Sequence, residues 1–321
     1  MEIDRVAVEL RDTIARQPRL DLRRKIFRIA GRAGPRVIKW PTVAGVTIGR
    51  ARINGVRVRT YEPTEVRSDV ELLWIHGGGM IIGAPPMDDL LCTETAARLG
   101  IRITSVDYRL APEHRFPAPL DDCYSVWLGM AHRLGSAARI VVGGQSAGGG
   151  LAASLVQRLH DGAEAHAEAH AGAHPGARPI ARPLAQPLAQ WLFSPMLDDR
   201  TAADRSLDDL DHFMWNNASN YLGWKALLGR VPGSAEVPPY AVAARRDDLS
   251  GLPRTWLGVG DIDLFLNEDL DYARRLAAAD VDVVVNVVAG APHGFESVVP
   301  DAELARRFRS EAQDWLASVI A

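Results

Sequence analysis

Arg139-Ile140-Val141-Val142-Gly143-Gly144-Gln145-Ser146-Ala147-Gly148-Gly149 is the stretch that decides the fold of this chain. Its apolar start predicts a buried strand, and the small residues from Gly149 to His160 predict a helix after the turn. A G-x-S-x-G turn between a strand and a helix is typical of a nucleophile elbow, which exposes a serine hydroxyl at the end of the strand. Because Gly144 and Gly148 have no Cβ, strand and helix can approach closely beside Ser146.

A second glycine-rich turn, His76-Gly77-Gly78-Gly79, follows another apolar run at residues 71–75. Successive glycines let backbone N–H groups point at one spot, where an oxyanion can be held. A flexible loop or a phosphate cradle is the alternative, but neither Gly-Lys-Ser/Thr nor a G-x-G-x-x-G with its acidic partner accompanies the turn. The two turns, one strand–helix unit apart, therefore favour nucleophilic catalysis.

The composition limits the class of protein. The 321 residues suffice for one large α/β domain with additions or for two ordinary domains. With 47% apolar and 24% charged residues and a net charge of -3, the chain is typical of a soluble globular protein with no strong attraction to nucleic acid or anionic membranes. No apolar stretch reaches the ~20 residues that span a bilayer. The charged N-terminus lacks a signal-peptide core, and Cys92 and Cys123 are expected to be reduced, so we expect a cytoplasmic location.

Eight strand-like segments, with helical patterns between them from the third onward, predict the fold class. The strands are expected at Val43–Ile48, Val56–Tyr61, Leu72–Ile75, Ile101–Val106, Ile140–Val142, Trp191–Phe193, Thr255–Val259 and Val283–Val288. The helices are expected at Met87–Leu99, Leu120–Leu134, Leu151–His160, Leu266–Ala279 and Ala302–Ile320. This alternation predicts a mostly parallel sheet with helices on both faces. The Asn54-Gly55 pair predicts a hairpin, which would give the sheet an antiparallel start.

We divide the chain into an N-terminal helical cap segment, residues 1–42, and a core, residues 43–321. Residues 31–35 are expected to interrupt the helices of the first segment. Within the core, residues 161–190 are low in complexity and are expected to form a solvated surface insertion. Residues 206–239 are rich in aromatics and could form an interaction surface. A lid over the site is the better interpretation, because the segment falls near the strand ends that carry the chemistry.

The low-complexity insertion also contains His166, His170 and His174 at four-residue spacing. On one helix face such a series can bind a divalent metal ion. Alanine and glycine fill most of the rest of this stretch, so a surface insertion is the better interpretation.

A serine nucleophile needs a base to accept its proton and a carboxylate to orient that base. After an elbow serine, these partners follow along the chain as an acid and then a histidine. Asp261 and Asp263 follow the strand at 255–259, and His293 follows the strand at 283–288. The carboxyl ends of these strands share the edge where open α/β sheets bind ligands. Chemical reasoning alone does not decide whether Asp261 or Asp263 orients the histidine, since one of them can instead cap the next helix.

These motifs resemble those of the hormone-sensitive-lipase-like group of the α/β-hydrolase superfamily, the bacterial carboxylesterases with an HGGG motif. The matching runs appear in family order and cover roughly residues 45 to 320. They are His76–Gly79, Asp107–Ala118, Gly144–Gly149, Ser194–Asp198, Asp248–Pro253, Asp263 and His293–Phe295. The run Tyr108-Arg109-Leu110-Ala111-Pro112-Glu113 is highly specific to this group.

The resemblance implies the α/β-hydrolase fold with a small helical cap and a role for each site residue. Ser146 would be the nucleophile, His293 the general base and acid, and Asp263 the orienting carboxylate. Asp263 is chosen over Asp261 because the run from Asp263 to Glu268 aligns with the family's Asp-Pro-Leu-x-Asp-Glu. The oxyanion hole would be formed by the backbone N–H groups of Gly78, Gly79 and Ala147. The residues that support the site would be His76, Gly77, Gly144 and Gly148. No metal or organic cofactor is implied.

Three residues depart from the family pattern. Gln145 precedes the nucleophile where the family commonly has Asp or Thr, and Leu264 replaces the usual proline after the acid. Met80 follows the HGGG motif where an aromatic residue is frequent. These departures are expected to affect the pH profile, the turn after the acid and the shape of the acyl pocket.

The expected activity is hydrolysis of short-chain carboxylic esters, as small-molecule substrates, through an acyl-enzyme. A deacetylase or amidase acting on a specific small metabolite would use the same three residues. A small-molecule receptor on the same scaffold is the rival from another class, but it would be expected to lose part of the triad. The terminal helix, Ala302 to Ala321, is expected either to close the sheet or to join a homodimer.

Overall fold

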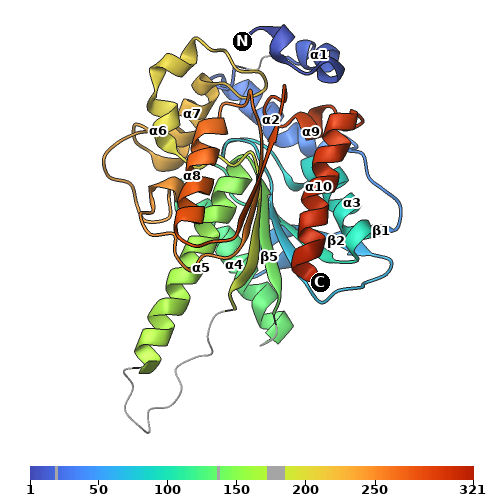
Figure 1. Ribbon diagram of the computed structural model, residues 1–321, viewed down its shortest axis with the longest axis vertical. Helices are drawn as coiled ribbons and strands as arrows, with labels where there is room; N and C mark the ends of the chain where they lie inside the picture. Colours follow the sequence, from blue (N-terminus) through green and yellow to red (C-terminus); the bar gives the residue numbers. More distant parts are fainter. Residues whose placement is uncertain (19–20, 136–137, 172–184) are drawn as a thin grey trace.

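The structure is a computed structural model. It is built around a twisted sheet with helices on both faces (Figure 1). The structure describes residues 1–18, 21–135, 138–171 and 185–321, and for residues 163–171 it describes the backbone alone. The strands are β1 (Val46–Ile53), β2 (Val56–Pro63), β3 (Glu71–Ile75), β4 (Arg102–Val106), β5 (Ile140–Gln145), β6 (Pro187–Phe193), β7 (Thr255–Gly260) and β8 (Val283–Val288).

The strands pair in the order β1-β2-β4-β3-β5-β6-β7-β8. β1 with β2 and β2 with β4 are antiparallel, and the other neighbours are parallel. This confirms the expected eight-stranded, mostly parallel sheet with an antiparallel start. The carboxyl ends of β3, β5, β7 and β8 therefore lie at one edge, where the candidate residues follow them.

The helices account for most of the remaining chain. The α-helices are α1 (Val8–Ala15), α2 (Lys25–Val37), α3 (Asp89–Leu99), α4 (Ala118–Leu134), α5 (Ala147–Ala171), α6 (Asp199–Ala203), α7 (Asn217–Leu228), α8 (Leu266–Ala278), α9 (Phe295–Val298) and α10 (Glu303–Ile320). The 3₁₀ helices are η1 (Ile3–Arg5), η2 (Pro85–Asp88), η4 (Arg205–Asp208) and η5 (Ala243–Arg245). Within the described residues, none of these helices is long and apolar enough to cross a bilayer.

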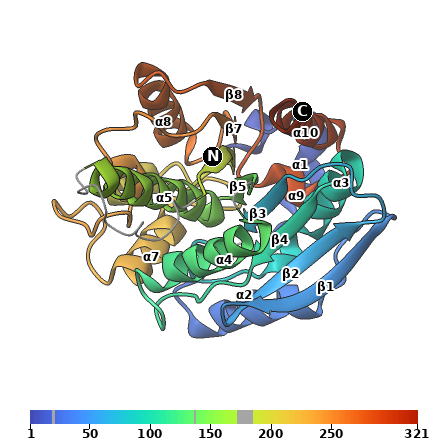
Figure 2. The ribbon, with the colours of Figure 1, turned by 90° about the horizontal axis from the view of Figure 1, so that it is seen from below.

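Alternation along the strands builds a separate core on each face of the sheet. Leu73 and Ile75 of β3 belong to the core under α4, α5 and α8. Leu72 and Trp74 of the same strand belong to the core under α3 and α10. Figure 2 shows these two sets of helices on opposite faces. Side chains two residues apart share a face, which is why strands buried on both sides read as continuous apolar runs.

Aromatic rings fill the core under α10. Trp74 and Trp191 meet edge to face with ring centroids 5.6 Å apart, and Phe193 lies 4.8 Å from both Trp191 and Trp256. Phe308 of α10 completes the cluster at 5.6 Å from Phe193. Edge-to-face contacts at such distances stabilise a core beyond the area that they bury. The terminal helix therefore closes the sheet, which was one of its two expected roles.

The first strand is displaced from its expected range of Val43–Ile48. β1 begins at Val46 and continues to Ile53, where it meets the two-residue turn Asn54-Gly55. Both turn residues have positive φ, 47° and 85°, as the expected hairpin requires. The strand extends beyond the apolar positions because pairing continues in register to Ile53 opposite Val56.

The expected interruption of the N-terminal helices at residues 31–35 is wrong. α2 runs through this stretch to Val37 with Pro35 inside it. A helical proline cannot donate to the carbonyl four residues before it, which here belongs to Gly31. The N–H of Gly83 donates to that carbonyl instead, at 3.1 Å. A tertiary hydrogen bond thus compensates for the proline and ties α2 to the segment that follows the His76–Gly79 turn.

The boundaries expected for the insertion at 161–190 also differ from the structure. α5 continues to Ala171, and β6 already begins at Pro187, four residues before the expected strand. Alanine is the strongest helix former, which explains why the Ala-rich start of this stretch prolongs α5. His174 lies outside the described residues, and the side chains of His166 and His170 are not described. The possible metal site formed by these three histidines therefore lies outside what the structure describes.

Candidate active site

The nucleophile elbow is a strained turn held by backbone hydrogen bonds. Ser146 lies between β5 and α5 with φ of 55°, a conformation that costs energy for a residue with a Cβ. Its N–H donates to the carbonyl of Phe193 in β6 at 2.8 Å, and its own carbonyl accepts from the N–H of Met196 at 2.9 Å. The two neighbouring segments therefore fix the serine in this conformation.

Two glycines permit the close approach that the elbow needs. A Cβ on Gly148 would stand 2.0 Å from the carbonyl oxygen of Ile75, at the end of β3. A Cβ on Gly144 would stand 2.4 Å from the carbonyl oxygen of Gly148. Both distances are far below van der Waals contact with a rigid backbone atom. Any other residue at these positions would push α5 away from the sheet and displace Ser146.

Ser146, His293 and Asp263 are linked by two hydrogen bonds. Nε2 of His293 lies 2.9 Å from Oγ of Ser146, and Nδ1 lies 2.8 Å from Oδ2 of Asp263. Each of the three residues is less than 10% exposed. Because the carboxylate accepts from Nδ1, that nitrogen carries the proton and Nε2 is free to accept one from the serine hydroxyl.

The two candidate acids have different partners. The second oxygen of Asp263 accepts from the N–H of Phe265 at 3.0 Å, which fixes the carboxylate. The Phe265 ring also stands edge-on to the His293 imidazole, with centroids 5.1 Å apart. Asp261 instead accepts from the N–H of Gly290 at 2.6 Å and so holds the loop after β8. Asp263 is the acid that contacts His293.

Burial and charge act in opposite directions on His293. Burial is the largest single influence and disfavours the charged form of His293, but the adjacent Asp263 carboxylate and the nearby Glu296 favour that form and together outweigh burial. The pKa of His293 is consequently raised above its ordinary value. The site therefore favours proton acceptance by this imidazole, which is what a general base requires.

His76 has the opposite character. Burial lowers its pKa to about 4, so the ring is neutral at physiological pH. Its Nδ1 lies 2.7 Å from the carbonyl oxygen of Gly77, and its ring stacks on Tyr108 with centroids 4.3 Å apart. The Tyr108 hydroxyl donates to the His76 carbonyl at 3.0 Å. His76 therefore supports the glycine turn, and within the described residues no hydrogen bond joins its ring to Ser146.

The glycine turn brings N–H donors next to the serine. A Cβ on Gly77 would lie 3.3 Å from Cβ of Ser146, so the turn passes directly beside the nucleophile. Within the described part of the chain, the N–H groups of Gly78, Gly79 and Ala147 have no hydrogen-bond acceptor outside their own element. Free N–H groups beside a nucleophile can bind an oxyanion.

Trp215 lies against this turn from the segment at 206–239. A Cβ on Gly79 would stand 2.1 Å from the Trp215 ring, and the tryptophan is buried. A Cβ on Gly223 in α7 would stand 2.7 Å from the Gly79 carbonyl oxygen. The expectation that this segment lies near the site came from its place in the sequence near the strand ends. Its contact with Gly79 was not predicted, because the sequence does not show which aromatic ring meets the turn.

Gln145 connects the elbow to the segment that carries His293. Its Nε2 donates to Oε1 of Glu296 and, at 3.2 Å, to the Ser297 hydroxyl. Glu296 is buried, and burial raises its pKa. Sequence reasoning noted Gln145 as a departure and did not identify this partner. A glutamine amide can donate to a carboxylate, whereas the Asp common in the family would place a second acid beside Glu296.

The described residues contain no cluster of His, Cys, Asp and Glu side chains with the geometry of a metal site.

Comparison with known proteins gives the family. A family model described as the alpha/beta hydrolase fold matches residues 72–297. Carboxylesterase NlhH of Mycobacterium tuberculosis is 30% identical over 268 residues, which cover 80% of this chain and 77% of that protein. The solved structure of a bacterial heroin esterase matches with a TM-score of 0.82 and 31% identity over 99% of both chains. An esterase of the bacterial hormone-sensitive lipase family has a TM-score of 0.75 and 25% identity, covering 98% of this chain and 99% of its own. The chain therefore belongs to the hormone-sensitive-lipase-like group of the α/β-hydrolase superfamily.

Proposed function

We propose that this protein is a serine carboxylesterase that hydrolyses short-chain carboxylic esters through an acyl-enzyme. The observation that carries the proposal is the unbroken pair of hydrogen bonds from Ser146 to His293 and from His293 to Asp263. The three residues come from separate loops that meet at one edge of the sheet. An arrangement of this kind activates a serine hydroxyl at neutral pH.

In the acylation step, Oγ of Ser146 attacks the ester carbonyl carbon while Nε2 of His293 takes the hydroxyl proton. The carbonyl oxygen becomes negatively charged and accepts hydrogen bonds from the N–H groups of Gly78, Gly79 and Ala147. Each such donor lowers the barrier by about 3 kcal/mol. When the tetrahedral intermediate collapses, His293 gives the proton to the leaving alcohol.

In the deacylation step, a water molecule replaces the alcohol. Nε2 of His293 takes a proton from the water, whose oxygen attacks the acyl carbon, and the same backbone N–H groups bind the oxyanion. The proton then returns from His293 to Oγ of Ser146 as the carboxylic acid leaves. Throughout both steps Asp263 holds the imidazole in one orientation and stabilises its charged form.

We assign residues 1–42 and 206–239 to a cap over this site. The contact of Trp215 with Gly79 supports the assignment for the second segment. For the first segment, Arg32 of α2 donates to the carbonyls of Ile81 and Ala111 at 2.8 and 2.6 Å.

A Trp215→Ala variant should lose kcat with little change in fold. Unchanged kinetics on every ester would contradict this assignment.

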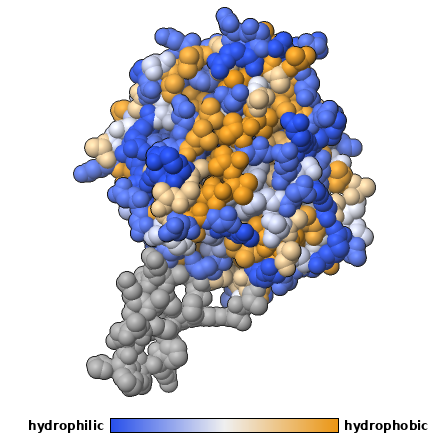
Figure 3. All heavy atoms as spheres, in the orientation of Figure 1, coloured by the Kyte–Doolittle hydropathy of each residue, from blue (hydrophilic) through white to orange (hydrophobic). Residues whose placement is uncertain are grey.

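A homodimer through β8 is part of the proposal. β8 is an edge strand, and Val284, Val285 and Val287 are each about 40% exposed. In the view of Figure 3, apolar surface runs down the middle of this face, where Figure 1 shows the strand between α8 and α10. A second copy can cover an unpaired apolar edge of this kind.

Light scattering should give twice the chain mass, and a monomer at micromolar concentration would contradict the dimer.

The cytoplasm is the proposed location. Cys92 and Cys123 are free thiols, and both are buried. Burial raises the pKa of both thiols, which keeps them protonated and unreactive. Unpaired cysteines are typical of reducing compartments. Recovery of the protein outside the cytoplasm on fractionation of its host would contradict this location.

The first prediction concerns Ser146→Ala. Loss of the nucleophile should lower kcat on p-nitrophenyl acetate by at least about 10,000-fold while leaving the fold intact. On a series of p-nitrophenyl esters, the wild type should show its highest kcat/KM on short acyl chains and a decline beyond about eight carbons, as extra methylenes exceed the pocket. Near-normal activity of the variant would overturn the mechanism. Cleavage of p-nitroacetanilide in preference to the matching ester would instead identify an amidase.

The second prediction concerns the acid and the pH profile. Only neutral His293 accepts a proton, and its pKa is raised, so kcat/KM of the wild type should rise with pH with a midpoint above 6.5. Asp263→Asn removes the charge that raises this pKa, so the midpoint should move to lower pH and kcat should fall about 1,000- to 10,000-fold.

Asp261→Asn is the matched control, since it removes an equal charge two residues away. Its midpoint should remain that of the wild type, because Asp261 contacts Gly290 and not His293. A larger loss of kcat in Asp261→Asn than in Asp263→Asn would reverse the assignment of the acid.

A further inference from the structure

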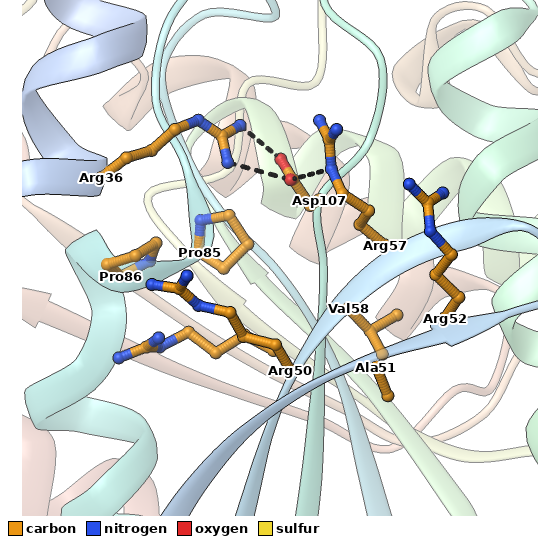
Figure 4. A pocket seen from close by; sticks show the side chains of 10 residues that line it. Arg36, Arg50, Ala51, Arg52, Arg57, Val58, Pro85, Pro86 and Asp107 are labelled. Carbon is orange, nitrogen blue, oxygen red and sulfur yellow. Dashed lines mark hydrogen bonds and ion pairs between the residues drawn. The ribbon is translucent and has the colours of Figure 1, made fainter.

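A second concave site lies on the β1–β2 hairpin, at a place that the esterase chemistry does not use. This pocket of about 640 Å³ is bounded by the hairpin, by Pro85 and Pro86 of η2, by α2 and by Asp107 after β4 (Figure 4). Ser146, His293 and Asp263 do not line it. Five arginines do, and they come from three elements: Arg36 in α2, Arg50 and Arg52 in β1, and Arg57 and Arg59 in β2.

Four of these arginines face each other in pairs across the hairpin. The register places Arg50 opposite Arg59 and Arg52 opposite Arg57. Residues two apart on a strand share a face, so both pairs lie on one side of the hairpin. Like charges directly opposite each other destabilise a pair of strands. Without a counter-charge, the hairpin would therefore carry two adjacent pairs of arginines that repel each other.

The acidic groups at this pocket neutralise only part of the charge. Asp107 accepts from Arg36 at 2.6 and 3.0 Å and from Arg57 at 3.0 Å, as the dashed lines of Figure 4 show. Arg59 forms a two-pronged ion pair with Asp89 at 2.7 and 2.6 Å. Two carboxylates thus face five guanidinium groups, which leaves about three positive charges on the pocket wall.

The arginines of β1 are the least neutralised. Arg50 is exposed and has no hydrogen bond or ion pair within the described residues. Arg52 is also exposed, and its Nη1 donates to the carbonyl of Gly55 at 2.7 Å. These two guanidinium groups retain donors that can meet a ligand.

Protection of the sheet edge does not account for this cluster. β1 is an edge strand, and charged residues along such a strand discourage pairing with other chains. That reason applies to Arg50 and Arg52, but it does not require a second row of arginines on β2. The whole chain has a net charge of -3, so the excess of positive charge is local to this part of the surface. A counter-charge that binds in the pocket would explain both rows.

We propose that this pocket binds a phosphate-bearing small molecule with at least two negative charges. A guanidinium group gives two parallel hydrogen bonds to the oxygens of a phosphate, and opposed arginines can hold one from two sides. The volume lies within the range of small-molecule sites, about 300 to 1,000 Å³. A hollow site of this size suits a dissolved ligand better than the flat surface of a membrane.

Pyrophosphate is the probe for the test, titrated into the full chain by calorimetry at low ionic strength, with chloride at equal ionic strength as the reference. Saturable binding near one ligand per chain is expected, together with a rise in Tm. Arg50→Glu should weaken this binding at least about tenfold, since a hydrogen bond to a charged group is lost and repulsion is added. Binding that does not saturate, or that chloride reproduces, would overturn the proposal.

The same variant distinguishes a binding role from a structural one. Arg50→Glu replaces a repulsive cross-strand pair with an attractive one, so its Tm without ligand should equal or exceed that of the wild type. Its turnover of p-nitrophenyl acetate should stay at the wild-type level, because Arg50 makes no contact with the Ser146 site. A lower Tm with unchanged affinity for pyrophosphate would show that the arginine only supports the hairpin.

Two further arms complete the test. Arg16→Glu makes the same change of charge at an exposed arginine outside the pocket and should leave the affinity unchanged. An equal loss in Arg16→Glu would show that general charge, and not this pocket, attracts the anion. Co-sedimentation with phosphatidylcholine vesicles that contain phosphatidic acid, without affinity for pyrophosphate, would overturn the dissolved ligand and identify a lipid headgroup.

Discussion

The chemistry of this site depends on one steric constraint, the absence of a Cβ where α5 crosses the end of β3. A Cβ on Gly148 would stand only 2.0 Å from the carbonyl oxygen of Ile75. Because glycine has no Cβ, the helix can start directly against the strand. The turn before it then holds Ser146 at a positive φ, with its hydroxyl at the carboxyl edge of the sheet. The loops after β7 and β8 end at the same edge, which is why Asp263 and His293 reach the serine.

Environment gives two buried histidines opposite roles. Burial is the dominant influence on His76 and lowers its pKa to about 4, so its ring stays neutral and supports the glycine turn. His293 is also buried, yet the Asp263 carboxylate helps to raise its pKa, which suits the general base that we propose. Gln145 and Glu296 add a second link between the elbow and the histidine loop. In the arginine pocket on the hairpin, Asp107 and Asp89 neutralise only part of the positive charge, and Arg50 has no acidic partner within the described residues.

Much of the fold was predictable because apolar strands and amphipathic helices alternate along the chain. Ser146 and His293 were predictable from their places at strand ends. Asp261 and Asp263 were not separable by chemistry, since both follow β7 and only the turn into α8 decides which carboxylate meets the imidazole. The continuation of α2 through Pro35 was missed because its compensating donor, Gly83, lies far away in sequence. Long-range contacts of this kind leave no local signal.

Covalent trapping with a phosphonate tests whether Ser146 is the nucleophile. A p-nitrophenyl phosphonate ester mimics the tetrahedral intermediate and reacts only with an activated nucleophile next to an oxyanion hole. We expect one phosphonyl group per chain, located by peptide mass mapping on Ser146, with complete loss of ester hydrolysis. Labelling of a different residue, or full activity after stoichiometric labelling of Ser146, would contradict it.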